Sequence, residues 1–109
     1  MKTKKRKKKT GETTLIPDKT DKRVGSIAVS TAGHDAGLLL VIVAGMDSDY
    51  VLVADGKTRK LAAPKKKKMQ HLSILTSLSE RETEKVRKGD CNDSFLRRAI
   101  SAIDLEGLT

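Results

Sequence analysis

The residues of this chain that could do chemistry are mainly lysines and arginines. Four lysines in a row, Lys65 to Lys68, directly follow Pro64, and two further cations, Arg59 and Lys60, come shortly before them. Clustered ammonium and guanidinium groups bind phosphate through their charge and their N–H donors. Because Pro64 restricts the backbone and an apolar segment follows, we expect the run to be held in place and to bind phosphate. The other interpretation is a solvated loop, or an edge strand that lysines protect from aggregation.

A second group of cations lies at the start of the chain. Residues 1–11 contain seven basic side chains and nothing apolar after Met1. Because like charges repel and nothing can be buried, we expect a disordered arm here, followed by a polar linker up to Lys22. The arm either lies along phosphates or only makes the protein more soluble.

Charge and length limit the class of protein. The chain has 109 residues, with 23 Lys and Arg against 14 Asp and Glu, which gives a formal net charge of +9. This length suits one domain with a modest core. The longest apolar run, Leu38 to Ala44, has seven residues, whereas a membrane span needs roughly 20. We therefore expect no membrane association. Leu15 and Ile16 are the only large apolar residues before Pro17, so we expect no secretory signal and a location in the cytoplasm, associated with the ribosome.

The sequence contains no group of residues with the spacing of a known catalytic or metal-binding site. The Ser, His and Asp residues match no known motif, and no glycine-rich loop leads into a helix. Asp47 and Asp49 suit the capping of a turn. Cys91 is a lone cysteine, and His34 and His71 lie far apart, so neither an internal disulfide nor a zinc site is expected. We expect no catalysis, no cofactor, no metal and no small-molecule substrate.

The elements that must position the cations are predicted to be short strands. Alternating or apolar segments predict strands at 26–30, 38–43, 50–53, 58–61 and 69–75. Asp55-Gly56 is typical of a type I′ hairpin, which would pair 58–61 with 50–53. Such a series of short strands predicts a mainly β fold, a small barrel or sandwich.

The pattern becomes helical after Thr76. Ser79 and Glu82 have the spacing of a capping box, and Gly89 marks the expected end of that helix. A second helix should follow caps at residues 92–94 and carry Leu96, Ile100 and Ile103 on one face. These helices either cover a barrel edge or bind a protein partner.

Aromatic content restricts the kind of recognition. Tyr50 and Phe95 are the only aromatic residues. Modules that bind single-stranded RNA stack bases on several aromatic side chains, which this chain cannot supply. We therefore expect contacts with the phosphates and 2′-hydroxyls of folded, double-helical RNA.

Residues 25–43 resemble a KOW motif, because a strand, the turn Gly33-His-Asp-Ala-Gly37 and an apolar strand follow one another. D-G-K at 55–57 and P-K-K-K-K-x-x-H-L at 64–72 add to the resemblance. The chain is similar to bacterial KOW-domain RNA-binding proteins, which resemble large-subunit ribosomal proteins of archaea and eukaryotes. The resemblance covers about residues 24–75. It implies an SH3-like barrel whose motif loop touches RNA, usually in or around the ribosome.

The motif loop departs from the family at two positions. Members often carry Lys or Arg on either side of the loop aspartate, whereas this chain has His34 and Ala36. This difference moves the expected RNA contact toward the lysine run and the arm. Gly33 and Gly37 suit a tight turn with positive φ. Asp35 between them can accept hydrogen bonds from the N–H groups of the loop, as a binding element or only as a structural turn.

The sequence thus predicts a disordered basic arm and linker at 1–22, a KOW-type SH3-like barrel at 23–76 and a helical C-terminal extension at 77–109. The expected function is non-catalytic binding of structured RNA, with ribosomal RNA as the expected partner and ribosomal proteins as further ones. One alternative is a protein-interaction module of the transcription or translation machinery that uses the C-terminal helix. Another is a non-specific DNA-binding protein. The candidate RNA-binding residues are Lys4, Lys5, Arg6, Lys7, Lys8 and Lys9 in the arm, Gly33, His34, Asp35 and Gly37 in the loop, and Arg59, Lys60, Lys65, Lys66, Lys67 and Lys68 at the basic edge.

Overall fold

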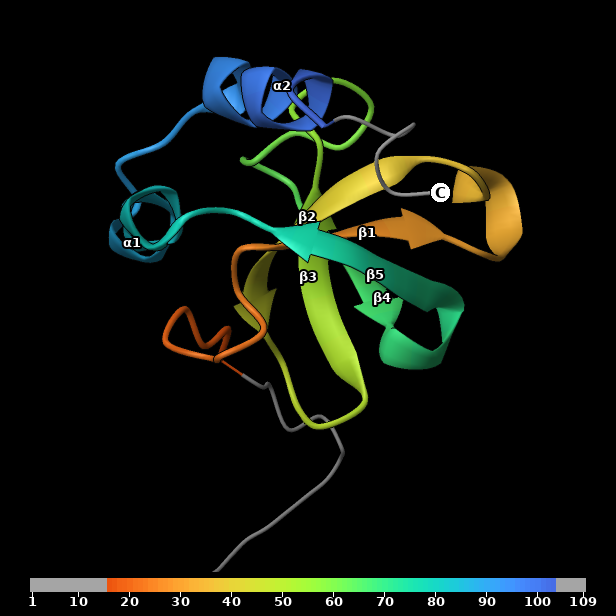
Figure 1. Ribbon diagram of the computed structural model, residues 1–109. Helices are drawn as coiled ribbons and strands as arrows, with labels where there is room; N and C mark the ends of the chain where they lie inside the picture. The colour runs from red at the N-terminus through yellow and green to blue at the C-terminus, as the bar shows by residue number, and fades with distance from the viewer. Residues whose placement is uncertain (1–15, 104–109) are drawn as a thin grey trace, which may run out of the picture.

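The computed structural model describes residues 16–103, so the arm predicted at 1–11, with its cations Lys4 to Lys9, lies outside the described residues. Within residues 16–103 the chain is mainly β, with two short α-helices beside the sheet (Figure 1). The elements are β1 (Ser26–Ser30), the 3-10 helix η2 (Gly33–Asp35), β2 (Leu39–Gly45), β3 (Tyr50–Ala54), β4 (Lys65–Lys68), the 3-10 helix η3 (Met69–His71), β5 (Leu72–Ser77), α1 (Glu80–Lys88) and α2 (Asp93–Ser101). Neither helix of this range is long and apolar enough to cross a membrane.

The strands of the described chain form one antiparallel sheet in the order β4-β3-β2-β1-β5. Strands β1 to β4 pair one after the other, and β5 returns to pair with β1. The register shifts between Ile27 and Ala28 and between Ile42 and Ala44. Such irregularities bend a strand and increase its twist. The predictions of a mainly β fold and of strands near 26–30, 38–43 and 50–53 are confirmed.

Strand β2 is buried on both of its faces. Leu40 and Ile42 belong to a core cluster with Val51 and Val53 of β3. The alternate residues of β2 pack in a second cluster with Val86 of α1 and Leu96 of α2. Because side chains of a strand point alternately to opposite faces, one face of the sheet packs against itself and the other is covered by helices. The apolar face predicted for the second helix is therefore part of the core.

The helix ends follow the predicted capping chemistry. Ser79 and Glu82 form a complete capping box at the start of α1, and Gly89 ends the helix with φ 76°. The side chain of Asn92 accepts a hydrogen bond from the Phe95 backbone N–H and so caps α2. Both predicted helices and their caps are confirmed.

The hairpin predicted at Asp55-Gly56 is wrong, and residues 58–61 form no strand. The Asp55 carboxylate accepts hydrogen bonds from the backbone N–H groups of Lys57 and Arg59, at 2.9 and 2.7 Å, and closes a wider turn. The backbone N–H of Leu61 then donates to the Asp93 carboxylate at 2.8 Å. Side-chain capping and attachment to α2 thus replace a two-residue hairpin, and β3 pairs with β4 instead.

The strand predicted at 69–75 begins later than expected. Met69 to His71 form η3, and β5 runs from Leu72 to Ser77. The chain must pass from β4 at one edge of the sheet to β5 at the other, and the 3-10 turn makes this change of direction.

The segment before β1 is attached to the end of β2. Asp18, in the predicted linker, forms two backbone hydrogen bonds of 2.8 Å with Gly45.

Candidate nucleic-acid interface

The four-lysine run forms strand β4 and lies at an edge of the described sheet, where it pairs with β3. Lys65 lies opposite Val53 and Lys67 opposite Val51, while Lys66 and Lys68 lie opposite Leu52 and Tyr50. Directly opposed residues of an antiparallel pair share a face of the sheet. Lys65 and Lys67 are therefore on the face of the buried valines, and Lys66 and Lys68 are on the other face.

Three cationic side chains meet at Asp35, whose side chain is only 5% exposed. The Lys65 ammonium group donates to the carboxylate at 2.9 Å, and Arg59 Nη2 donates to both of its oxygens at 3.1 and 3.3 Å. Lys67 Nζ lies 3.7 Å from the same carboxylate. We call these four residues the Asp35 cluster. It joins η2, the turn after β3 and strand β4 at one place.

The expectation that the carboxylate of Asp35 accepts hydrogen bonds from the N–H groups of its own loop is wrong. The described partners of this carboxylate are cationic side chains distant in sequence, and it is the backbone carbonyl of Asp35 that accepts a hydrogen bond from the Leu38 N–H, at 2.8 Å. Hydrogen bonds from Lys65 and Arg59, with their positive charge, hold the pKa of Asp35 below its ordinary value, although burial acts in the opposite direction. The carboxylate is therefore ionised at neutral pH. A buried carboxylate needs such partners to remain charged.

The motif loop, which is the segment 31–37 between β1 and β2, lies against Lys67, the buried lysine of this cluster. Lys67 Nζ donates to the Ala32 carbonyl at 3.2 Å, and the side chain of Lys67 is only 7% exposed. Gly33 and Gly37 have φ of 78° and 89°, which confirms the positive φ predicted for both. His34, between Gly33 and Asp35, is exposed. The loop thus presents an imidazole and glycine backbone at the surface, above the cluster.

The other face of β4 carries a different arrangement. Lys66 Nζ lies 4.8 Å from the centre of the Tyr50 ring, and Lys68 Nζ lies 6.0 Å from it. These are cation–π distances. Sequence reasoning missed Tyr50 because its proximity to the lysines depends on the pairing of β3 with β4. Lys60 is exposed in the turn before Pro64 and has no contact with Asp35 among the described ion pairs.

The structure therefore divides the candidate cations into groups. Arg59, Lys65 and Lys67 converge on Asp35, whereas Lys66 and Lys68 flank Tyr50. Arg59 and Lys65 are 32% and 34% exposed, so both reach solvent from the cluster. Lys67 is too deeply buried to contact a ligand directly.

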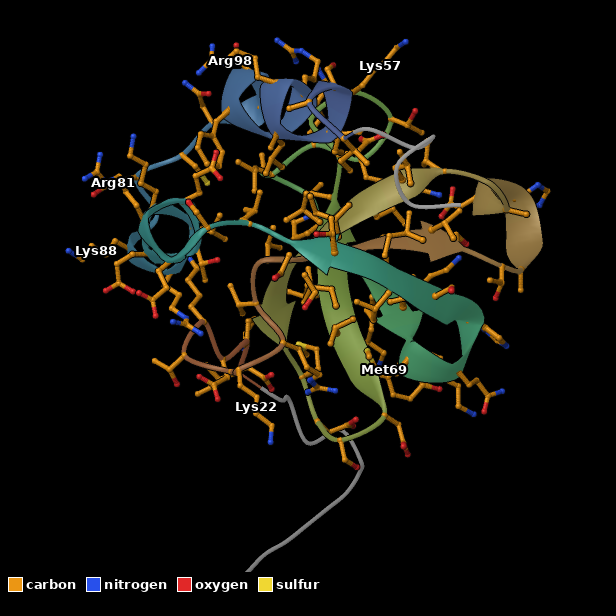
Figure 2. All side chains as sticks on the ribbon, viewed as in Figure 1. Lys22, Lys57, Met69, Arg81, Lys88 and Arg98 are labelled. Atoms are coloured by element: carbon orange, nitrogen blue, oxygen red, sulfur yellow. The ribbon has the colours of Figure 1, made fainter. Side chains whose placement is uncertain are left out.

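Further basic side chains extend from the helical side of the domain (Figure 2). Arg81 and Lys88 point outward from α1, and Arg98 and Lys57 point outward near α2. Neighbouring Arg97 donates through Nη1 to the Gly56 carbonyl at 2.7 Å and so fastens the turn after β3 to α2. None of these cations is among the RNA contacts predicted from the sequence.

Asp47 and Cys91, which the sequence also singled out, have structural roles. The Asp47 carboxylate accepts hydrogen bonds from the backbone N–H groups of Asp49 and Tyr50, at 2.8 and 2.9 Å, which confirms its predicted role in a turn. Cys91 is half-buried against the core, and burial raises the pKa of its thiol. Within residues 16–103, no three His, Cys, Asp or Glu side chains are grouped so that they could hold a metal ion.

Comparison of the sequence with protein-family models and with curated proteins finds no match.

Proposed function

We propose that this protein binds structured RNA, with ribosomal RNA as the proposed target, and that it does so without catalysis. The proposed interface consists of β4, the motif loop and the N-terminal arm. The observation that carries the proposal is that β4 is a strand made of four lysines, two of which reach into a cluster with the loop aspartate. Lysines of a strand are positioned before a ligand arrives, so less side-chain and backbone entropy is lost on binding.

The proposed fold is an SH3-like barrel of the KOW type. Support comes from the connectivity, in which four strands pair in succession and the fifth returns, after η3, to the first. The shifted registers in β1 and β2 support this proposal, because such bends are what closing a sheet around Leu40 and Ile42 would need. The turn Gly33-His-Asp-Ala-Gly37 connects β1 to β2 beside β4, where the rim of the proposed barrel would lie.

Double-helical RNA is the proposed ligand because the interface offers cations rather than stacking surfaces. Tyr50 is flanked by Lys66 and Lys68 instead of lying open to a base. Phosphates and 2′-hydroxyls of an A-form helix are recognised by shape and charge, which suits lysines on an ordered strand. Ribosomal RNA is the proposed member of this class because of the resemblance to KOW-domain proteins.

The test is crosslinking in cells, followed by sequencing of the attached RNA. We expect sites in folded ribosomal RNA. Sedimentation of the tagged protein through a sucrose gradient, with and without RNase, provides the second readout. A protein that stays away from ribosomal fractions under both conditions would contradict the ribosomal target. Competition between RNA and DNA duplexes of equal length then separates RNA binding from general binding of polyanions.

The protein-interaction alternative depended on a free apolar helix. Leu96 of α2 is fully buried against the sheet, and Ile100 and Ile103 are partly buried against the same cluster. The apolar face that a partner would use is therefore already in contact with the domain. A pull-down after nuclease treatment tests this alternative, because protein partners that survive nuclease would support it over RNA binding.

A further inference from the structure

Arg59 and Lys65 are brought together by a shared carboxylate. They come from the turn after β3 and from the start of β4, and both donate to Asp35. Two cations placed this close repel each other in the absence of an anion. The nearly buried carboxylate of Asp35 removes that repulsion and fixes both side chains at one place on the surface.

The cluster keeps a surplus of positive charge. Asp35 is one carboxylate, whereas Arg59, Lys65 and Lys67 are three cations, and these are the ion pairs of the cluster among the described residues. Arg59 donates to Asp35 through Nη2, and Lys65 donates to it through its ammonium group. A guanidinium has five N–H donors and an ammonium three, so both retain donors for a second acceptor. Both side chains are about one-third exposed, so that acceptor can approach from solvent.

We propose that Arg59 and Lys65 together bind one phosphate group of the RNA backbone and that Asp35 is the residue that positions them. This inference depends on the proposed RNA binding and names the place where a phosphate is held. A phosphate oxygen is the right ligand because it supplies negative charge to the surplus and accepts from both donors at once. Lys67, under the loop, supports the cluster from the buried side and does not touch the ligand.

If Asp35 positions Arg59 and Lys65, its replacement should weaken RNA binding, whereas an effect of net charge alone would strengthen it. Asp35→Asn removes one negative charge and raises the formal net charge of +9 by one, so a diffuse electrostatic interface would bind RNA more tightly. We expect the variant to bind about 3- to 10-fold more weakly, because Asn cannot hold Arg59 and Lys65 with charge-assisted bonds. The control is Asp90→Asn, an equal charge change at an exposed position between the helices. It should bind as tightly as the wild type or more tightly.

The assay is fluorescence anisotropy of a labelled RNA duplex at several salt concentrations. Loss of one ordered phosphate contact should reduce the slope of log K against log salt by about 1 for Asp35→Asn, although the variant carries more positive charge. A purely structural role for Asp35 would not lower this slope in a folded variant. A double-mutant cycle adds a second readout: in an Arg59→Ala/Lys65→Ala background, Asp35→Asn should cause no further loss of affinity.

The double variant Asp35→Asn/Lys67→Met controls for misfolding. It also replaces the buried lysine, so no buried charge is left without a counter-ion. This variant should keep the fold and show the same loss of affinity and slope. Binding by the Asp35 variants as tight as that of Asp90→Asn would overturn the phosphate site, as would an undiminished loss in the Arg59→Ala/Lys65→Ala background. Failure of the wild type to bind the duplex would instead contradict the proposed function itself. The two failures are therefore distinguishable.

Discussion

The carboxylate of Asp35 and the ammonium group of Lys67 lie 3.7 Å apart, and both side chains are almost completely buried. Lys67 lies opposite Val51, so its stem points to the apolar side of the sheet. Its charge is tolerated there because Asp35 lies close and the Ala32 carbonyl accepts a hydrogen bond from it. This pair connects the middle of β4 to the motif loop.

The two members of this pair should differ in their effect on stability. Replacing Asp35 by Ala leaves a buried lysine without its counter-ion, and we expect the free energy of unfolding to fall by about 3 kcal/mol. Replacing Lys67 by Met leaves Asp35 with Arg59 and Lys65, and should change it by less than about 1 kcal/mol. Urea unfolding measures both. A loss for Asp35→Ala as small as the one expected for Lys67→Met would mean that Lys67 tolerates burial without Asp35.

Gly56 and Gly37 provide a matched test of how the turn after β3 meets α2. Both have positive φ, but a Cβ at Gly56 would overlap the backbone of Asp93, whereas a Cβ at Gly37 would have no atom within 4 Å. Gly37→Ala should lower the free energy of unfolding by about 1 kcal/mol through backbone strain alone. Gly56→Ala should lower it by about 3 kcal/mol, because α2 must also shift. Thermal unfolding compares the two, and similar values would show that α2 moves freely.

Acid should weaken the ion pair of Asp21 and Arg23, which orients Arg23 in the segment before β1 toward the β2–β3 turn. Arg23 bonds the Asp21 carboxylate at 2.7 Å and donates to the carbonyls of Asp47 and Ser48. The Arg23 side-chain hydrogen bond lowers the pKa of Asp21 to about 2. Because the folded-state pKa lies below the unfolded one, the stabilisation is present above about pH 4 and is lost as the pH falls toward 2.

Asp21→Asn tests this relation. At pH 6 the variant should be less stable than the wild type by about 1 to 2 kcal/mol, and the difference should shrink as the pH is lowered from 4 to 2. Urea unfolding across this pH range gives the two curves. A difference that stays constant down to pH 2 would show that the stabilisation does not depend on the charge of Asp21.

The elements that could be predicted from the sequence are those with local signals. The alternation of Ser26 to Ser30 indicates β1, and Ser79 with Glu82 indicates the start of α1, because neighbouring residues create each pattern. Strand β4 gives no such signal, since four lysines neither alternate nor favour strands. Lys65 to Lys68 form a strand because they pair with β3, and no local sequence pattern predicts this pairing.

The candidate site shows the same limit. A loop aspartate and a lysine run were identifiable as candidates, but their contact joins residues 30 positions apart. The hairpin expected at Asp55-Gly56 fails for a related reason. The Asp55 side chain can cap a wider turn as well as start a tight one, and only the attachment of Leu61 to Asp93 decides between them.

The N-terminal arm should contribute to RNA affinity through charge. Deleting residues 1–11 removes seven basic side chains. If four or five of them neutralise phosphates, the slope of log K against log salt should fall by about 3 to 5 units. The deletion should hardly change the free energy of unfolding of the remaining domain. A slope equal to that of the full chain would mean that the arm does not touch RNA.

The two faces of β4 lead to the last prediction, for which the chain supplies its own control. Lys65/Lys67→Ala and Lys66/Lys68→Ala each remove two positive charges from the same strand. The first removes two partners of Asp35 and should lower the free energy of unfolding by about 2 kcal/mol. The second removes side chains that flank Tyr50 and should lower it by less than about 1 kcal/mol.

RNA binding by these two variants, measured at one salt concentration where both are folded, separates an ordered contact from a cloud of charge. The probes are an RNA recovered by crosslinking and a random duplex. Because Lys65 is held in place by Asp35 before RNA arrives, Lys65/Lys67→Ala should lose more affinity for the recovered RNA and more of the discrimination between the two probes. Lys66/Lys68→Ala should lose affinity for both probes alike, as expected for less constrained charges. Equal losses by both variants, for both probes, would mean that RNA senses only the number of lysines in β4 and not the side of the strand on which they lie.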